Sequence, residues 1–110
     1  MKKIFYNYNF KNKVAIVTGA STGIGFEIAK NFIINQSNLV ICSRNINSLR
    51  RSFEILNKLK KKYQKIYYLK IDVSSQTQIK KLIRFTISKF KKIDILINNA
   101  AIYGPKGNIE

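Results

Sequence analysis

An apolar run that stops abruptly in a glycine-rich turn constrains this chain more than any other feature. Residues 14–17 read Val-Ala-Ile-Val, a β-favouring run without polar alternation, as expected for a strand buried on both faces of a parallel sheet. Gly19, Gly23 and Gly25 punctuate the turn, and apolar residues then recur at helical spacing (Ile28, Ala29, Phe32 and Ile33). The order strand, glycine turn, helix predicts an α/β fold with helices on both faces of the sheet.

The glycine turn has the chemistry of an anion site. The first backbone N–H groups of a helix lack intrahelical partners and carry a partial positive charge, so a phosphate is stabilised there. Gly19 permits a tight turn, Gly23 lets a pyrophosphate approach the backbone, and Gly25 lets the helix pack closely on the strand. Ser21 and Thr22 can add hydroxyl donors. The turn therefore indicates a nucleotide phosphate site, with an ordinary strand-to-helix turn as the alternative.

Two motifs in this chain resemble those of the short-chain dehydrogenase/reductase family. Residues 18–25 read Thr-Gly-Ala-Ser-Thr-Gly-Ile-Gly and are similar to its Thr-Gly-x-x-x-Gly-x-Gly fingerprint. Residues 98–101 read Asn-Asn-Ala-Ala and resemble the Asn-Asn-Ala-Gly motif that follows the family's fourth strand. Ala101 replaces the family's glycine and leaves the backbone less free to adopt positive φ, a change that we expect to be tolerated. The resemblance implies an NAD(P)-dependent oxidoreductase that moves hydride between nicotinamide and a carbonyl or alcohol.

Three further apolar runs, at 39–42, 66–71 and 93–97, predict the rest of the sheet. Two helical patterns separate them. The first pattern has a basic last turn from the lysines at 58 and 60–62, and it runs over Leu49, Phe53, Leu56 and Tyr63. The second runs over Ile79, Leu82, Ile83, Thr86 and Phe90. Right-handed βαβ units predict a Rossmann-type doubly wound parallel sheet, for which the family's strand order is 3-2-1-4. We expect residues 1–110 to form a single NAD(P)-binding domain that is truncated after the fourth strand.

The segment after the second strand indicates which dinucleotide is bound. In dinucleotide folds an acidic side chain there accepts from the ribose 2′-hydroxyl of NAD. Here residues 43–45 read Ser-Arg-Asn, and a guanidinium donates only, so Arg44 suits the 2′-phosphate of NADP. NADP(H) is therefore favoured over NAD(H), and the alternative is a surface arginine in a loop.

The ends of the third and fourth strands complete the expected site. The resemblance implies that Asp72 accepts from the adenine amino group and that the backbone of Val73 meets the ring. Asp72 equally fits a helix N-terminal signal, because serines open the next helix. Asn98 and Asn99 stand at the edge where open α/β sheets bind ligands, or they are ordinary turn formers. The expected cofactor-binding residues are Gly19, Ser21, Thr22, Gly23, Ile24, Gly25, Ser43, Arg44, Asp72, Val73, Asn99 and Ala100.

No catalytic residue is predicted within these 110 residues. The resembled family uses a serine, a Tyr-x-x-x-Lys pair and usually another asparagine. None of the six tyrosines here is followed by lysine four positions later, and the chain has no histidine. We expect turnover of a small carbonyl or alcohol substrate only in a full-length form of the protein that also carries these catalytic residues. We expect that form to be a homo-oligomer. The alternative is a non-catalytic nucleotide-binding fragment that needs a partner chain.

The formal net charge of +16, from 21 basic and 5 acidic residues, raises the possibility of a nucleic-acid or membrane partner. The basic residues are scattered over several expected helices. No zinc-ligand spacing, basic heptad or aromatic RNA-binding signature accompanies them. We therefore expect no specific nucleic-acid partner and no metal site, and a basic nucleic-acid binder is the reading that the scattered lysines do not favour.

Cysteine content and hydropathy bear on location. Cys42 is the only cysteine, which excludes an internal disulfide and fits a reducing compartment. No run approaches the roughly 18 apolar residues that a membrane span requires. The expectation is a cytoplasmic protein.

Overall fold

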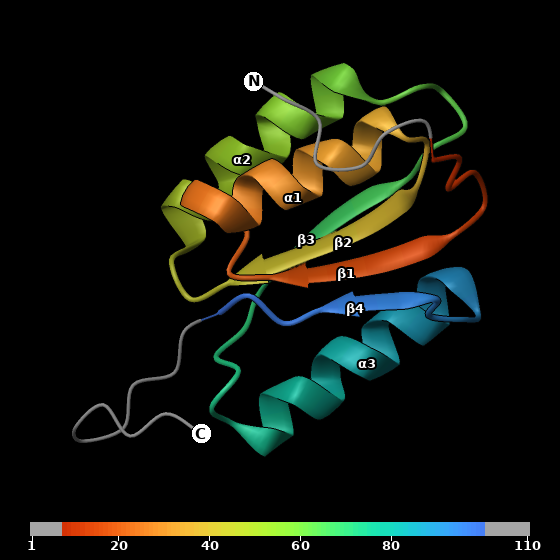
Figure 1. Ribbon diagram of the computed structural model, residues 1–110. Coiled ribbons are helices and arrows are strands. Elements are labelled where there is room, and N and C mark those ends of the chain that lie inside the picture. Colours follow the sequence, from red (N-terminus) through yellow and green to blue (C-terminus); the bar gives the residue numbers. More distant parts are fainter. Residues whose placement is uncertain (1–7, 101–110) are drawn as a thin grey trace.

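Strands and helices alternate along the chain in the computed structural model, which describes residues 8–100 (Figure 1). In order they are β1 (Val14–Thr18), α1 (Gly23–Ile34), β2 (Asn38–Ser43), α2 (Ile46–Leu59), β3 (Ile66–Lys70), α3 (Gln76–Phe90) and β4 (Ile95–Ile97). The four strands are parallel and lie in the order β3-β2-β1-β4. This confirms the predicted Rossmann-type sheet and its strand order. Ala101, the departure from the family motif, lies outside the described residues.

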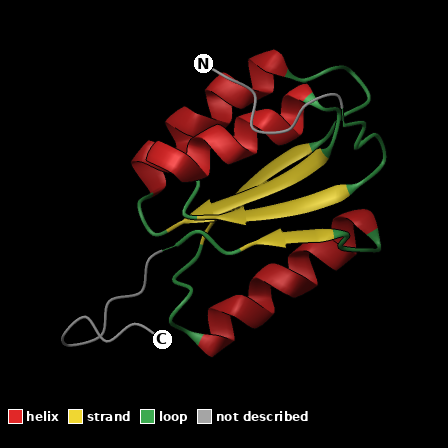
Figure 2. Ribbon diagram, viewed as in Figure 1, coloured by secondary structure: helices red, strands yellow, loops and turns green. Residues whose placement is uncertain are grey.

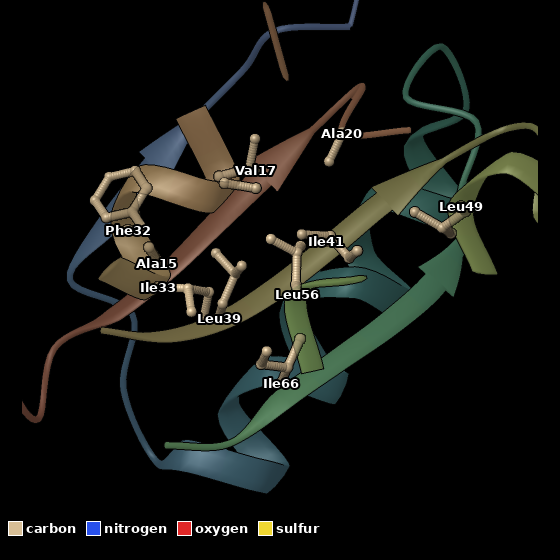
Figure 3. Packing of buried hydrophobic residues seen from close by; sticks show 11 residues of the cluster. Ala15, Val17, Ala20, Phe32, Ile33, Leu39, Ile41, Leu49, Leu56 and Ile66 are labelled. Atoms are coloured by element: carbon tan, nitrogen blue, oxygen red, sulfur yellow. The ribbon is translucent and has the colours of Figure 1, made fainter. Parts of the chain in front are cut away.

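The sheet separates two layers of helices, with α1 and α2 on one face and α3 on the other (Figure 1). All five residues of β1 are buried, because neighbouring positions alternate between the two faces and both faces are covered. One set of side chains packs under α1 and α2, as Figure 3 shows: Ala15, Val17, Leu39, Ile41, Phe32, Ile33 and Leu56. The other set packs on the side of α3: Ile16, Val40, Cys42, Ile71 and Leu82.

The helix α2 is shorter than the sequence pattern indicated. It ends at Leu59, so Tyr63 is outside the helix and only Lys58 lies in its last turn. The chain leaves the helix because Gln64, which is fully buried, holds residues 61–64 in a turn. Its side-chain oxygen accepts from the Lys61 N–H at 2.7 Å, and its amide nitrogen donates to the carbonyls of Ile33 (3.0 Å) and Ser37 (2.6 Å).

Strand β4 is also shorter than expected and is only partly buried. The predicted run 93–97 contributes three residues, which pair with Ala15–Val17 of β1, and the side chain of Leu96 is 56% exposed. Asp94 shortens the strand because its side chain bonds to the chain instead of entering the core. Its carboxylate accepts from the Val14 N–H at 2.8 Å and from Lys92 Nζ at 3.1 Å. The Asp94 N–H donates to the Val14 carbonyl at 2.9 Å, so the two residues are joined twice.

None of the helices within residues 8–100 has the length and apolar character needed to cross a membrane.

Asp94 should make the stability of the β1–β4 pair depend on pH. Desolvation opposes ionisation, but the Val14 N–H, Lys92 and Lys13 together lower the pKa of Asp94. A lowered folded-state pKa stabilises the fold above the unfolded value of about 4, and this contribution is lost as pH falls through the folded pKa. We expect Asp94→Asn to lower the free energy of unfolding at pH 7 by ~1 kcal/mol, measured by urea denaturation.

The same variant should lose less stability than the unsubstituted protein between pH 5 and pH 2. Glu54→Gln, which neutralises an exposed carboxylate on α2, serves as the control and should leave both values unchanged. An Asp94→Asn protein with an unaltered acid profile would contradict the assignment.

Candidate functional site

The carboxyl ends of the strands and the N-termini of the helices lie along one edge of the molecule, at the left of Figure 2. A cavity of about 450 Å³ opens there. It brings together seven of the residues predicted from the sequence: Gly19, Ser21, Ser43, Arg44, Asp72, Val73 and Ala100. Asn45, Ile71 and Ser74 also line it and were not predicted. The other predicted residues, Thr22, Gly23, Ile24, Gly25 and Asn99, are not part of this lining.

The three glycines of the turn differ in what surrounds them. Gly19 has φ +62°, and a Cβ built on it would lie 2.9 Å from the Cα of Ala100. A Cβ on Gly25 would overlap the carbonyl oxygen of Gly19 and come within 2.6 Å of Asn99 Nδ2. Gly23 also has φ +62°, but its missing Cβ would point into open space. Gly19 and Gly25 therefore permit close packing, whereas Gly23 leaves room for a ligand.

Thr18 holds the end of β4 against the glycine turn. Its side chain is buried, and its Oγ1 accepts from the N–H groups of Asn99 at 2.9 Å and Ala100 at 3.1 Å. The same hydroxyl donates toward Asn98 Oδ1 at 3.0 Å. Asn99 Nδ2 in turn donates to the Gly19 carbonyl at 3.3 Å. Asn98 and Asn99 thus join the segment after β4 to the end of β1. Asn99 does not line the cavity itself, but it bonds to Gly19, which does.

Thr18 is absent from the residues predicted to form the site, although it opens the same motif as Gly19. The sequence did contain a motif that could have identified Thr18, because this threonine is the first residue of the fingerprint at 18–25. Its role depends on a contact across about 80 positions of the chain, and such a contact cannot be read from local periodicity.

Arg44 is exposed, directly precedes the N-cap residue of α2, and lines two cavities. Beside the one already described, a second of about 450 Å³ is bordered by Arg44, Lys70, Asp72, Gln78 and Lys81. Within residues 8–100 the ion pair found is that of Lys92 with Asp94, so no described carboxylate pairs with the guanidinium of Arg44. Asn45 fixes the backbone after it, because its side chain accepts from the Ser48 N–H at 3.0 Å and caps α2.

Asp72 begins the segment that leads into α3, as expected of a helix N-terminal signal, whereas its contact with adenine stays a prediction. Its Oδ1 accepts from the Ser74 hydroxyl at 2.7 Å and the Ser74 N–H at 3.0 Å, just before Ser75 caps α3. These bonds, with the positive charge of Arg44, lower the pKa of Asp72. No described residue donates a hydrogen bond to Oδ2. Asp72 lines the cavity, where its ionised carboxylate can accept from a ligand N–H.

The described part of the chain offers little for metal or thiol chemistry. No group of three or more His, Cys, Asp or Glu side chains in residues 8–100 is placed to hold a metal ion. Cys42 is buried in β2, and its burial raises the pKa of the thiol to about 12. The thiol is therefore neutral and unreactive at pH 7.

Comparison with known proteins extends these observations. A family model described as short chain dehydrogenase matches residues 13–110. The chain is 39% identical over 100 residues to "Dehydrogenase/reductase SDR family member 4" of Caenorhabditis elegans, which covers 91% of this chain and 38% of that protein. The chain thus spans well under half the length of this relative.

Two solved structures share the architecture and hold a nucleotide. L-sorbose reductase from Gluconobacter frateurii, complexed with NADPH and L-sorbose, has a TM-score of 0.81 and 26% identity over 90% of this chain and 37% of its own. A short-chain dehydrogenase/reductase from Burkholderia phymatum in complex with NAD has a TM-score of 0.74 and 26% identity, over 81% of this chain and 31% of its own. Proteins similar to this chain therefore bind either dinucleotide.

The hydroxyl of Thr18 should be a main support of the site. Thr18→Val keeps the shape of the side chain but leaves the N–H groups of Asn99 and Ala100 without their acceptor. We expect a loss of roughly 1 kcal/mol in the free energy of unfolding, because the two partly buried N–H groups lose their hydrogen-bond acceptor. Urea denaturation provides the measurement.

Thr86→Val is the matched control, since it removes a buried threonine hydroxyl that bonds only to the Leu82 carbonyl within α3. It should cost less than Thr18→Val. Equal losses in the two variants would argue against a special role for Thr18.

Proposed function

The chain belongs to the short-chain dehydrogenase/reductase family, and on that premise we propose that residues 1–110 are one NADP(H)-binding domain of an oxidoreductase. The observation that carries the proposal is the cavity at the carboxyl edge of the sheet. Gly19 and Ser21 of the glycine turn border it after β1, and Arg44 and Asp72 border it after β2 and β3. A dinucleotide has complementary groups in the same order, with a pyrophosphate, a ribose and an adenine.

The N-terminus of α1 is suited to the pyrophosphate. Thr22 is its N-cap residue but makes no side-chain cap hydrogen bond, and the first turn contains no acidic residue. In contrast, Asn45 and Ser75 cap α2 and α3 with their side chains. The open space beside Gly23 lets a phosphate reach the uncapped N–H groups. We assign Ser21, Thr22, Gly23 and Ile24 to this part of the site.

The opposite side of the cavity is suited to the adenosine. Arg44 has no carboxylate partner among the described residues and can pair with a 2′-phosphate through two N–H groups. The free oxygen of Asp72 can accept from the adenine amino group, and Val73 lines the same wall. Ser43 contributes to this edge, where its hydroxyl donates to the Asn45 carbonyl at 3.3 Å.

These residues bind and orient the cofactor, and none of them is assigned a catalytic step. When bound, NADP(H) supplies the hydride that is exchanged with a carbonyl or alcohol compound. Asn99 and Ala100, held by Thr18, fix the wall of the cavity where β4 ends. The proton donor that such a reaction needs is not assigned, because no tyrosine of this chain is followed by lysine four positions later.

Partners and location complete the proposal. The substrate would be a small carbonyl or alcohol compound, and the catalytically complete form would be a homo-oligomer. We assign no specific nucleic-acid partner, because no recognition motif accompanies the basic charge. The single, buried Cys42 supports a reducing, cytoplasmic location.

Arg44 should set the preference for NADP over NAD. Replacing it in Arg44→Asp removes the partner of the 2′-phosphate and supplies an acceptor for the ribose hydroxyl. We expect NADPH to bind roughly ten- to a hundredfold more weakly, the equivalent of one charge-assisted pair, and NADH to bind more tightly. Fluorescence titration with both nucleotides measures the change. Arg50→Asp, at an exposed position on α2 outside the cavity, is the control, and equal NADPH and NADH affinities before substitution would refute the assignment.

Gly23 should be the glycine whose substitution affects binding more than packing. In Gly23→Ala the new Cβ meets no protein atom but occupies the approach to the α1 N-terminus, and the positive φ costs about 1–2 kcal/mol. We expect a folded protein in which NADPH affinity falls at least about tenfold. Calorimetry gives the affinity, and urea denaturation without nucleotide gives the stability. A folded variant with unchanged affinity would place the phosphate elsewhere.

A further inference from the structure

Ser52 links α2 to the glycine turn. It lies in the second turn of the helix and is 4% exposed. Its Oγ donates a hydrogen bond of 2.8 Å to the backbone carbonyl of Ser21, 31 positions earlier in the chain. The side chain contacts the turn from the side of α2. No feature of the local sequence singles out this serine.

The two segments that this bond joins are the two halves of the proposed site. On one side, Ser21 stands between Gly19 and Gly23 in the turn. On the other side, Asn45 caps α2 and follows directly on Arg44. Asn45 and Ser52 are seven positions apart on the same helix, or ~10 Å along its axis. A bond that fixes the position of Ser52 relative to the turn therefore also fixes the start of the helix, and with it the position of Arg44.

Few other polar contacts hold these halves together. Within the described residues, the turn is also tied to β2 through the Ala20 N–H, which donates to the Cys42 carbonyl at 3.2 Å. Beside the Ser52 bond lies a cavity of about 350 Å³, bordered by Ser21, Thr22 and Gly23, by Phe26 of α1, and by Ser48, Arg51, Ser52 and Ile55 of α2. Phe26 of α1 and Phe53 of α2 pack on one apolar cluster, and the Ser52 hydrogen bond adds a directed contact between α2 and the turn to this packing.

Given the proposed function, we infer that Ser52 is a positioning residue for the dinucleotide. It holds the phosphate-binding turn and the Arg44 edge at the separation that one NADPH molecule spans. Ser52 does not itself contact the nucleotide in this assignment. Its contribution is to pre-organise two half-sites so that a ligand bound at one half meets the other half already in place.

A comparison of two ligands tests this inference. NADPH uses both halves of the site, whereas adenosine 2′-monophosphate uses only the Arg44 and Asp72 edge. We expect Ser52→Ala to weaken NADPH binding about three- to tenfold, which corresponds to one neutral hydrogen bond. The affinity for adenosine 2′-monophosphate should not change. Ser52→Thr keeps the hydroxyl donor at a residue that lines the adjoining cavity, and it should bind NADPH as tightly as the unsubstituted protein.

Ser37→Ala is the matched control, because Ser37 is a fully buried serine whose hydroxyl donates to backbone carbonyls of Lys13 and Asn38 at the other end of β2. It should leave both affinities unchanged. If Ser52→Ala does not fold, Ser52→Cys, with a weak thiol donor, replaces it in the same comparison.

The possible failures are distinguishable. An unsubstituted protein that does not bind NADPH would overturn the proposed function and this inference with it. A protein that binds NADPH, but whose Ser52 variant weakens both ligands equally or neither, would overturn the role of Ser52 alone.

Discussion

The contact between Gly25 and Gly19 is the constraint on which the rest of the site depends. Because no Cβ fits between the first turn of α1 and the carbonyl of Gly19, α1 approaches β1 as closely as backbone atoms allow. The same two glycines leave space for the segment at 99–100, which the Thr18 hydroxyl holds in place. The end of β1, the start of α1 and the end of β4 therefore form one packed unit. The wall of the cavity follows from that packing.

The order of elements could be predicted from the sequence because it depends on local properties. Buried parallel strands are short apolar runs, and their helices show a regular spacing of apolar residues. The strand order came from the family resemblance and is confirmed. The two differences, at Tyr63 and at β4, have a common cause. Gln64 and Asp94 are polar side chains that bond to distant backbone groups, and those partners are invisible in a local pattern.

The site was predictable to the extent that its residues follow strand ends. Arg44, Asp72 and the first part of the glycine turn, Gly19 and Ser21, were expected together and do line one cavity, whereas their contacts with a nucleotide stay predictions. Thr18 and Ser52 were missed because each acts through a backbone atom of another element. Serines and threonines are common in helices and strands, and nothing in their local neighbours marks the few that reach across. Only the packed arrangement distinguishes them.

The register of β4 on β1 is fixed by the pattern of its side chains and by contacts at its two ends. Ile95 and Ile97 pack on the core whereas Leu96 is 56% exposed, so sliding β4 by one residue would reverse the two faces and bring Asp94 or Asn98 into a paired position. The polar contacts lie at the two ends: Asp94 meets Val14 where β1 begins, and Asn99 meets Thr18 where β1 ends. A shifted strand would lose both at once. The contacts at its two ends therefore fix the position of this short edge strand along β1. The same contacts fix the position of Ala100, which follows β4 and lines the cavity.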